Sequence, residues 1–328
     1  MNRIGGLLPR IACIAVACTT AVAHAQQRSG DYPNRPLRII VTVPAGGSVD
    51  SVTRTMAQKL SENTGNSVIV DNRVGGTGTI AMNITTQAAP DGYTVMSASN
   101  SMVVTGVLKK VSYDIRKALD PVVQMSSGAY VLTINPSLPV NSVKDLIAYA
   151  KNKPDALSYG TPGIGSIIHL SSELLIFTAG RLRMVHVPYQ GNSFAIVDLI
   201  AGRIHMLLAA AGVAPHIKSG KLRGIAVTGS KRMRGFPDLQ TLAEAGVPGL
   251  VLENAYGLYA PAGVKPAILA RLNREVSTAM NTVEVRERLA IDGAEPASPH
   301  TPAAFKASFI GQFNQWDKFI KSSGIKLE

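Results

Sequence analysis

The fold is decided first by the stretch LRIIVTVPAGGSVD at residues 37–50. Residues 37–43 are mostly apolar and β-branched, which predicts a buried strand. A proline and two glycines then turn the chain, and residues 48–63 repeat apolar side chains at helical spacing. A buried strand, a tight loop and an amphipathic helix form the repeating unit of a doubly wound sheet, so we expect an α/β protein.

The same alternation continues along the chain. It predicts strands at residues 68–71, 93–98, 131–135, 157–159, 184–187, 204–208 and 222–227, and helices at 143–152, 167–178, 194–201, 265–281 and 301–322. Extended runs near 126–133 and 251–259 lie between two sets of units, so we expect two strands to cross between two lobes as a hinge. We assign residues 26–125 and 255–328 to lobe 1, and residues 126–254 to lobe 2.

The first 25 residues have the pattern of a secretory signal peptide. Two arginines and an apolar run at residues 11–22 precede Ala23-His24-Ala25, which matches the small-x-small cleavage pattern. We therefore expect a periplasmic protein whose mature chain begins at Gln26. Cys18, preceded by Ala15-Val16-Ala17, leaves a lipoprotein anchor as the alternative.

Composition excludes several classes of function. Both cysteines lie in the signal peptide, so the mature chain has no disulfide and no thiol nucleophile. Loss of Arg3 and Arg10 leaves 31 basic and 21 acidic residues, or +10, which suits an anionic partner. The basic residues are scattered and aromatic residues make up only 5%, which argues against nucleic acid. No histidine pair has metal-site spacing and no serine-nucleophile motif occurs, so we expect no metal, no cofactor and no catalytic residue.

Two glycine-rich loops carry the chemistry. In the first, Ala45, Gly46, Gly47 and Ser48 join the buried strand to a helix, at the sheet edge where open α/β sheets bind ligands. The glycines let a ligand approach the backbone, Ser48 is a good N-cap, and the free N–H groups of the helix start suit a carboxylate. Asp50 would stabilise the first turn. The alternative is an ordinary capped turn.

The second loop, Thr161-Pro162-Gly163-Ile164-Gly165-Ser166, repeats these features in the other lobe. Ser166 is its N-cap, and His169 lies three residues later, where a capping box would carry Glu or Gln. The helix dipole disfavours a cation there, so we expect a neutral His169 that contacts the ligand or caps the backbone locally. The glycine spacing matches neither a dinucleotide fingerprint nor a Walker A loop.

Three further loops each follow a predicted strand, although plain loop chemistry explains each of them as well. They contribute Gly76 and Thr77, Ser99 and Asn100, and Tyr189 and Gln190. The predicted ligand-binding residues are therefore Ala45, Gly46, Gly47, Ser48, Asp50, Gly76, Thr77, Ser99, Asn100, Thr161, Gly163, Gly165, Ser166, His169, Tyr189 and Gln190.

The mature chain resembles the Bug-type extracytoplasmic solute-binding receptors of tripartite tricarboxylate transporters. The resemblance covers it from about residue 31 onward, through motifs that occur in order: Tyr32-Pro33-x-Arg35-Pro36, Val43-Pro44-Ala45-Gly46-Gly47, Val70-Asp71-Asn72-Arg73, Ala88-Ala89-Pro90-Asp91-Gly92-Tyr93, His186-Val187-Pro188-Tyr189, Pro215-His216-Ile217-Lys218-x-Gly220-Lys221-Leu222-Arg223, Glu244-Ala245-Gly246 and Tyr256-Gly257-Leu258-Tyr259-Ala260-Pro261-Ala262-Gly263.

The resemblance implies a two-lobed, type II-like periplasmic-binding-protein fold with a ligand cleft. It also implies that backbone groups and waters of the two loops grip a small carboxylate, which integral membrane transporter subunits then receive from a monomeric receptor. Many family members carry an Asp-Asn pair after the strand that here ends at Met206-Leu207, whereas this chain has Leu208-Ala209-Ala210-Ala211, so we expect a ligand with an apolar body. A receptor for a signalling partner and a periplasmic enzyme using Asp50 and His169 as acid and base remain the alternatives.

Overall fold

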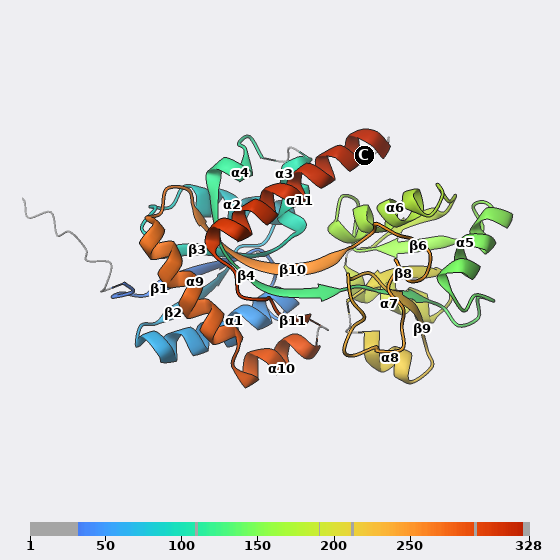
Figure 1. Cartoon of the computed structure of the whole chain (residues 1–328), viewed down its shortest axis with the longest axis horizontal. Coiled ribbons are helices and arrows are strands. Elements are labelled where there is room, and N and C mark those ends of the chain that lie inside the picture. Colours follow the sequence, from blue (N-terminus) through green and yellow to red (C-terminus); the bar gives the residue numbers. More distant parts are fainter. Residues whose placement is uncertain (1–31, 109–110, 190, 211–212, 292–293, 324–328) are drawn as a thin grey trace, which may run out of the picture.

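Two sheets, each at the centre of one lobe, organise the molecule (Figure 1). A computed structural model describes residues 32–108, 111–189, 191–210, 213–291 and 294–323. Within them, the lobe 1 sheet has the order β11-β4-β10-β3-β1-β2, with β1 Leu37–Val41, β2 Val68–Asn72, β3 Thr94–Ser99, β4 Leu119–Ala129, β10 Glu253–Pro261 and β11 Ala294–Pro296. The lobe 2 sheet has the order β7-β6-β8-β5-β9, with β5 Val131–Ile134, β6 Ser158–Thr161, β7 Val185–Pro188, β8 Met206–Ala209 and β9 Arg223–Val227. The predicted two-lobed α/β fold is confirmed.

Helices cover both faces of the lobe 1 sheet, as its sequence requires. Leu37, Ile39 and Val41 of β1 pack on one side, in a cluster that includes the apolar face of the first helix, whereas Ile40 packs on the other side. The lobe 1 helices are α1 Ser48–Thr64, α2 Thr79–Thr86, α3 Ser101–Val107, α4 Ile115–Ala118, α9 Pro266–Met280, α10 Val283–Ile291 and α11 Pro302–Ser323. The lobe 2 helices are α5 Val143–Asn152, α6 Ile167–Thr178, α7 Asn192–Ile200 and α8 Ala214–Lys218.

The crossing between the lobes is made by the long strands β4 and β10. They pair in antiparallel fashion from Glu253↔Ala129 to Pro261↔Leu119, with two register shifts that leave Met125 and Val122 as extra residues in β4. After Ala129 the chain continues directly into β5 of lobe 2 (Figure 1). Bulges bend a strand and increase its twist, so β4 is curved where it crosses. The domain boundaries assigned from the sequence, inside these strands, stay a prediction.

The last helix, α11, links the two lobes a second time. Thr301 caps it and Pro302 is its first residue, as predicted, since Thr301 Oγ1 accepts the N–H of Ala304 at 3.2 Å. Its early turns pack on β4 and its other end lies beside α6 (Figure 1). Near that end Phe319 meets Phe177 of α6 edge to face, with ring centroids 6.0 Å apart. A helix anchored on one lobe thus touches the other. Among the helices of the described residues, none combines the length and apolarity needed to cross a bilayer.

Candidate functional site

Both predicted loops lie at the edge of their sheet that faces the crossing. In lobe 1, the end of β3 pairs with β10 close to the point where β10 arrives from lobe 2, and β1 runs parallel to β3. In lobe 2, Ala209 at the end of β8 pairs with Val131, the first residue of β5 after the crossing, and β6 runs parallel to β8. The loops at residues 42–47 and 162–166 therefore emerge at facing edges, the usual position for ligands in open α/β sheets.

The lobe 1 loop presents the start of α1. Gly46 adopts a left-handed conformation with φ +82°, which glycine accepts without strain. Gly47 is extended, with φ −68° and ψ 159°, and it is the N-cap, so Ser48 is the first helical residue and not the predicted cap. No side chain caps this helix. The N–H groups of Ser48 and Val49 therefore have no acceptor within the helix and are available to an anion.

Asp50 holds this loop together from inside. The side chain is only 1% exposed, and its carboxylate accepts the Gly46 N–H at 2.8 Å, Arg54 Nε at 3.0 Å and Asn72 Nδ2 at 2.8 Å. Burial alone would raise the pKa of this carboxyl, but the hydrogen bonds from Arg54, Gly46 and Asn72 outweigh burial and lower the pKa. Asp50 is thus a charged acceptor whose bonding capacity is used within lobe 1.

The lobe 2 loop has the same backbone form. Gly165 is left-handed with φ +73°, and Ser166 is extended with φ −70° and ψ 158°, the values of Gly46 and Gly47 to within about 10°. Ser166 is the N-cap of α6, as predicted, and its Oγ accepts the N–H of His169 at 3.1 Å. The N–H groups of Ile167 and Ile168 remain without an acceptor in the helix. Each lobe therefore offers a helix start toward the crossing.

His169 occupies the place in lobe 2 that Asp50 occupies in lobe 1. The ring is 4% exposed and its Nδ1 accepts the Gly165 N–H at 3.1 Å, which is the local backbone cap that the sequence left open. Because Nδ1 accepts, the proton of the neutral ring is on Nε2. Burial, and then the neighbouring His186, lower the pKa of His169 to about 4, so the predicted neutral state has desolvation as its main cause.

A second histidine supports the same loop, and sequence reasoning missed it. The His186 ring stacks on His169 with centroids 4.1 Å apart, and its Nε2 lies 2.7 Å from Thr161 Oγ1 at the end of β6. Tyr159 also stacks on His186 and donates a hydrogen bond to Glu173 of α6. The signal available was the position of His186, on a strand that continues into a predicted ligand loop.

Asn100, also a predicted site residue, connects the end of β3 to the hinge strand β10. Its backbone N–H donates to Ala255 O at 2.9 Å and its Nδ2 donates to Glu253 O at 2.7 Å. Its Oδ1 is buried and has no hydrogen-bond partner in the described part of the chain, which leaves an acceptor for a donor on a ligand or water. Ser99 Oγ is 2.6 Å from Ser101 Oγ at the same edge.

The other predicted positions are less informative. Gly76 opens a short 3₁₀ turn at Gly76–Gly78. The hydroxyl of Tyr189 donates to Asp198 of α7 at 2.8 Å, and burial together with this carboxylate raises the pKa of Tyr189 to about 12. Gln190 and the side chain of Thr77 lie outside the described residues, as does the signal peptide. Ligand contact by any of the predicted residues stays a prediction.

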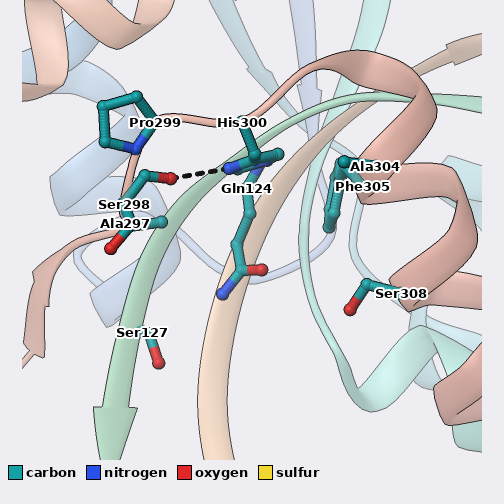
Figure 2. A pocket seen from close by; sticks show the side chains of 9 residues that line it. All are labelled: Gln124, Ser127, Ala297, Ser298, Pro299, His300, Ala304, Phe305 and Ser308. Atoms are coloured by element: carbon teal, nitrogen blue, oxygen red, sulfur yellow. Dashed lines mark hydrogen bonds between the residues drawn. The ribbon is translucent and has the colours of Figure 1, made fainter.

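A cavity of about 360 Å³ lies beside the hinge strand β4 (Figure 2). Its polar groups largely bind one another: His300 Nε2 accepts the Gln124 N–H at 2.9 Å, His300 Nδ1 donates to Ser298 O at 2.8 Å, and Ser127 Oγ donates to Glu253 at 2.6 Å. None of the predicted ligand residues lines it. We regard it as a feature of the hinge packing and assign it no ligand.

The fold and these loops define a class, the two-lobed binding proteins with facing loops at a strand crossing. The model of the tripartite tricarboxylate transporter family receptor matches residues 52–325. BugT of Bordetella pertussis is 33% identical over 323 residues, which cover 97% of this chain and 98% of BugT. Rpa4515 of R. palustris, solved with adipate, is 32% identical with a TM-score of 0.76, and the match covers 90% of this chain and 99% of that one. The periplasmic binding protein BugD is 27% identical with a TM-score of 0.76 at the same coverage.

The chain therefore belongs to the receptor family of the tripartite tricarboxylate transporters, which confirms the Bug-type resemblance. This family consists of solute-binding receptors.

Proposed function

We propose that this protein is a periplasmic receptor that captures a small organic carboxylate between its lobes and presents it to the membrane subunits of a tripartite tricarboxylate transporter. The observation that carries the proposal is the pair of helix starts, α1 and α6, with matched backbone form and unpaired N–H groups at facing sheet edges. A carboxylate has two oxygens and about four lone-pair sites, so it can accept from both helix starts at once. The N-terminal ends of both helix dipoles favour the negative charge.

Neutral donors suit a receptor that must release its cargo. A buried ion pair is costly to break, whereas backbone N–H groups and bridging waters can exchange with solvent. Asp50 and His169 have no acid or base role in this proposal, because their acceptor atoms are committed to Gly46 and Gly165. The protein then binds without turnover, as a monomer whose mature chain begins at Gln26.

The end of β8 favours a ligand with an apolar body. Ala209 is buried and Ala210 half-buried at the edge that faces the crossing, and Ala211 lies outside the described residues. Methyl groups offer no hydrogen bond to an amino or hydroxyl group. We therefore propose an aliphatic or aromatic acid, and the presence of adipate in the related Rpa4515 supports an aliphatic chain.

Proline substitution at the first helical position tests the proposal directly. Proline lacks the N–H but fits this position, and the extended conformations of Gly47 and Ser166 suit a residue before proline. We expect Ser48→Pro to weaken adipate binding about tenfold, as the loss of a hydrogen bond to a charged group does. Isothermal titration of the chain from Gln26 onward, against adipate, aromatic acids and amino acids, measures this.

Val283→Pro is the matched control. Val283 is the first residue of α10 and is 67% exposed. It should leave adipate binding unchanged. If no acid of the panel binds the wild-type protein, or if Ser48→Pro binds adipate as tightly as the wild type, the proposed site is wrong.

A further inference from the structure

The two ligand loops hold a glycine N–H with different chemistry. Gly46 donates to Asp50 and Gly165 donates to His169, in each case a side chain four residues further on. A carboxylate accepts a hydrogen bond whenever it is charged, and Arg54 helps to keep Asp50 charged. An imidazole nitrogen accepts only when it carries no proton. The hydrogen bond that fixes the lobe 2 loop is therefore lost when His169 takes up a proton. The hydrogen bond that fixes the lobe 1 loop does not change over the same pH range.

The groups that face the His169 ring come from three elements. His186 of β7 stacks on it at 4.1 Å, and Glu173 of α6 has Oε1 at 4.0 Å from His169 Nε2. Tyr159 of β6 donates to that same Oε1, so the oxygen nearest to the ring is already engaged. Two protonated imidazoles at this separation would repel each other, so the stacked pair carries at most one proton under moderate acidity.

We propose that His169 is a positioning residue that holds the lobe 2 ligand loop in its binding form only while the ring is neutral, so that acid loosens this loop and weakens carboxylate capture. This inference rests on the proposed function for its binding consequence, but not for its structural one. A proton on Nδ1 would place two donors, the ring N–H and the Gly165 N–H, against each other at 3.1 Å. The Gly165 peptide must then turn away, and Ser166, the adjacent N-cap, moves with it.

A shift in the Ser166 backbone alters the α6 start that faces the ligand. The neighbouring N–H groups of Ile167 and Ile168 have no acceptor in the helix, so their direction depends on the loop alone. Thr161 gives the loop a second attachment, since its Oγ1 contacts His186 Nε2 at 2.7 Å and accepts the Gly163 N–H at 3.3 Å. A proton that settles on His186 leaves Nε2 able to donate to Thr161, so His169 is the sensitive member of the pair.

Two substitutions separate the hydrogen bond from the ring stack. In His169→Asn, the side-chain oxygen takes the place of Nδ1, as the carboxylate oxygen of Asp50 does in lobe 1, but it does not titrate. In His169→Phe, the ring can still stack on His186 but accepts nothing. We expect His169→Phe to weaken adipate binding about tenfold at pH 7.5, the size of one misplaced hydrogen-bonded loop, and His169→Asn to restore most of that loss.

The ligand-free protein gives a second readout by NMR. The Gly165 amide resonance should follow the ring resonances of His169 as the pH is lowered from 7.5 to 3.5, while the Gly46 amide stays in place until Asp50 titrates at lower pH. In His169→Asn the Gly165 amide should not move over this range. The inference is wrong if Gly165 is indifferent to the protonation of His169, or if His169→Phe binds adipate like the wild type.

His205→Phe is the matched control. His205 Nδ1 accepts the N–H of Ser158 at 3.0 Å, at the opposite end of β6 from the loop. Its loss should lower the melting temperature without changing adipate affinity beyond twofold. If Gly165 follows His169 but adipate and the other acids fail to bind, the loop coupling stands and the proposed function fails.

Discussion

Asp50 and Asp145 occupy the same position in two helices but have different surroundings. Each accepts the N–H of the residue four positions before it, Gly46 at 2.8 Å and Asn141 at 3.0 Å. Asp145 is exposed, whereas Asp50 is buried and binds Arg54 and Asn72 as well. The same local hydrogen bond therefore contributes little to stability in α5 and more in α1, because removal of a buried acceptor leaves its donors unpaired.

We predict that Asp50→Ala lowers the free energy of unfolding by about 3 kcal/mol, because it removes a buried carboxylate that binds three donors. Asp145→Ala should cost much less, since water replaces the carboxylate there. Urea denaturation followed by circular dichroism compares the two. Equal losses of free energy would show that the additional hydrogen bonds of Asp50 do not stabilise the fold.

Acid should destabilise the fold through His169. Its pKa is 6.5 as a free group and about 4 in the native state, because of burial and then His186. Between these values the unfolded chain binds more protons than the native one. The contribution of His169 to the free energy of unfolding is therefore fully present above pH 6.5 and falls as the pH is lowered toward 4, by up to about 3 kcal/mol.

Urea unfolding of the wild type and of His169→Asn at pH 7 and pH 4.5 measures this loss. The substitution should remove most of the difference between the two pH values. A smaller slope should remain, because burial also lowers the pKa of His186 and of His205. An unchanged slope in the variant would contradict the assignment of the slope to His169.

At the scale of elements, the hinge strand β10 depends on a residue without a side chain. A Cβ at Gly257 would lie 2.8 Å from the Phe305 ring and 2.8 Å from the Tyr259 hydroxyl, and both side chains are buried. Gly257 pairs with Gln124 beside the Met125 bulge, so α11 packs closely where the strands bend.

We predict that Gly257→Ala costs about 2 kcal/mol through overpacking. Gly311→Ala is the opposite case, since a Cβ there meets nothing within 4 Å on α11, and it should stabilise by about 0.5–1 kcal/mol. Thermal melts of the two variants measure the signs. A stabilising Gly257→Ala would mean that the hinge is less tightly packed than described.

The elements most accurately predicted from the sequence were those with an independent signal at their start. The bounds of α5 and α6 are those expected, and α11 starts at the expected Thr301-Pro302 cap. The helices α2, α3, α4, α8 and α10 were not predicted. In α3 the run Met102, Val103 and Val104 is buried without a polar face, so its helical period is invisible in the sequence.

The two loops of the candidate site were predicted from the sequence, but the side-chain hydrogen bonds that hold them were not. Glycines after strands located both helix starts. The commitment of Asp50 and His169 to Gly46 and Gly165 could not be predicted, because it depends on the tertiary packing that buries both side chains beside their loops. The support from His186 required knowledge that β7 lies beside β6.

For the whole molecule, α11 joins the two lobes through one apolar cluster. A single apolar cluster includes Phe305 and Phe309 beside the lobe 1 sheet, Phe319 near the helix end, and residues of lobe 2 such as Ile168 and Leu170. We predict that Phe319→Ala costs about 3 kcal/mol, as aromatic truncation in a core does. Hydrogen exchange should then accelerate in β5 as well as in β3.

Phe194→Ala, which removes a ring that is 61% exposed on α7, is the control and should change neither strand. If Phe319→Ala accelerates exchange in lobe 1 alone, the link between the lobes through α11 carries no stability.

The reach of α11 has a practical use. The first turns of α11 rest on β4 and its last turns lie against α6. Any rotation of the lobes about the crossing strands therefore displaces these last turns relative to the lobe that carries α6. The Lys321 side chain, 74% exposed, and the exposed Lys151 of α5 offer attachment points on either side of that movement, and residues 26–328 contain no cysteine that would compete. A pair of dyes on cysteines placed there would report such a movement optically when a candidate ligand is added.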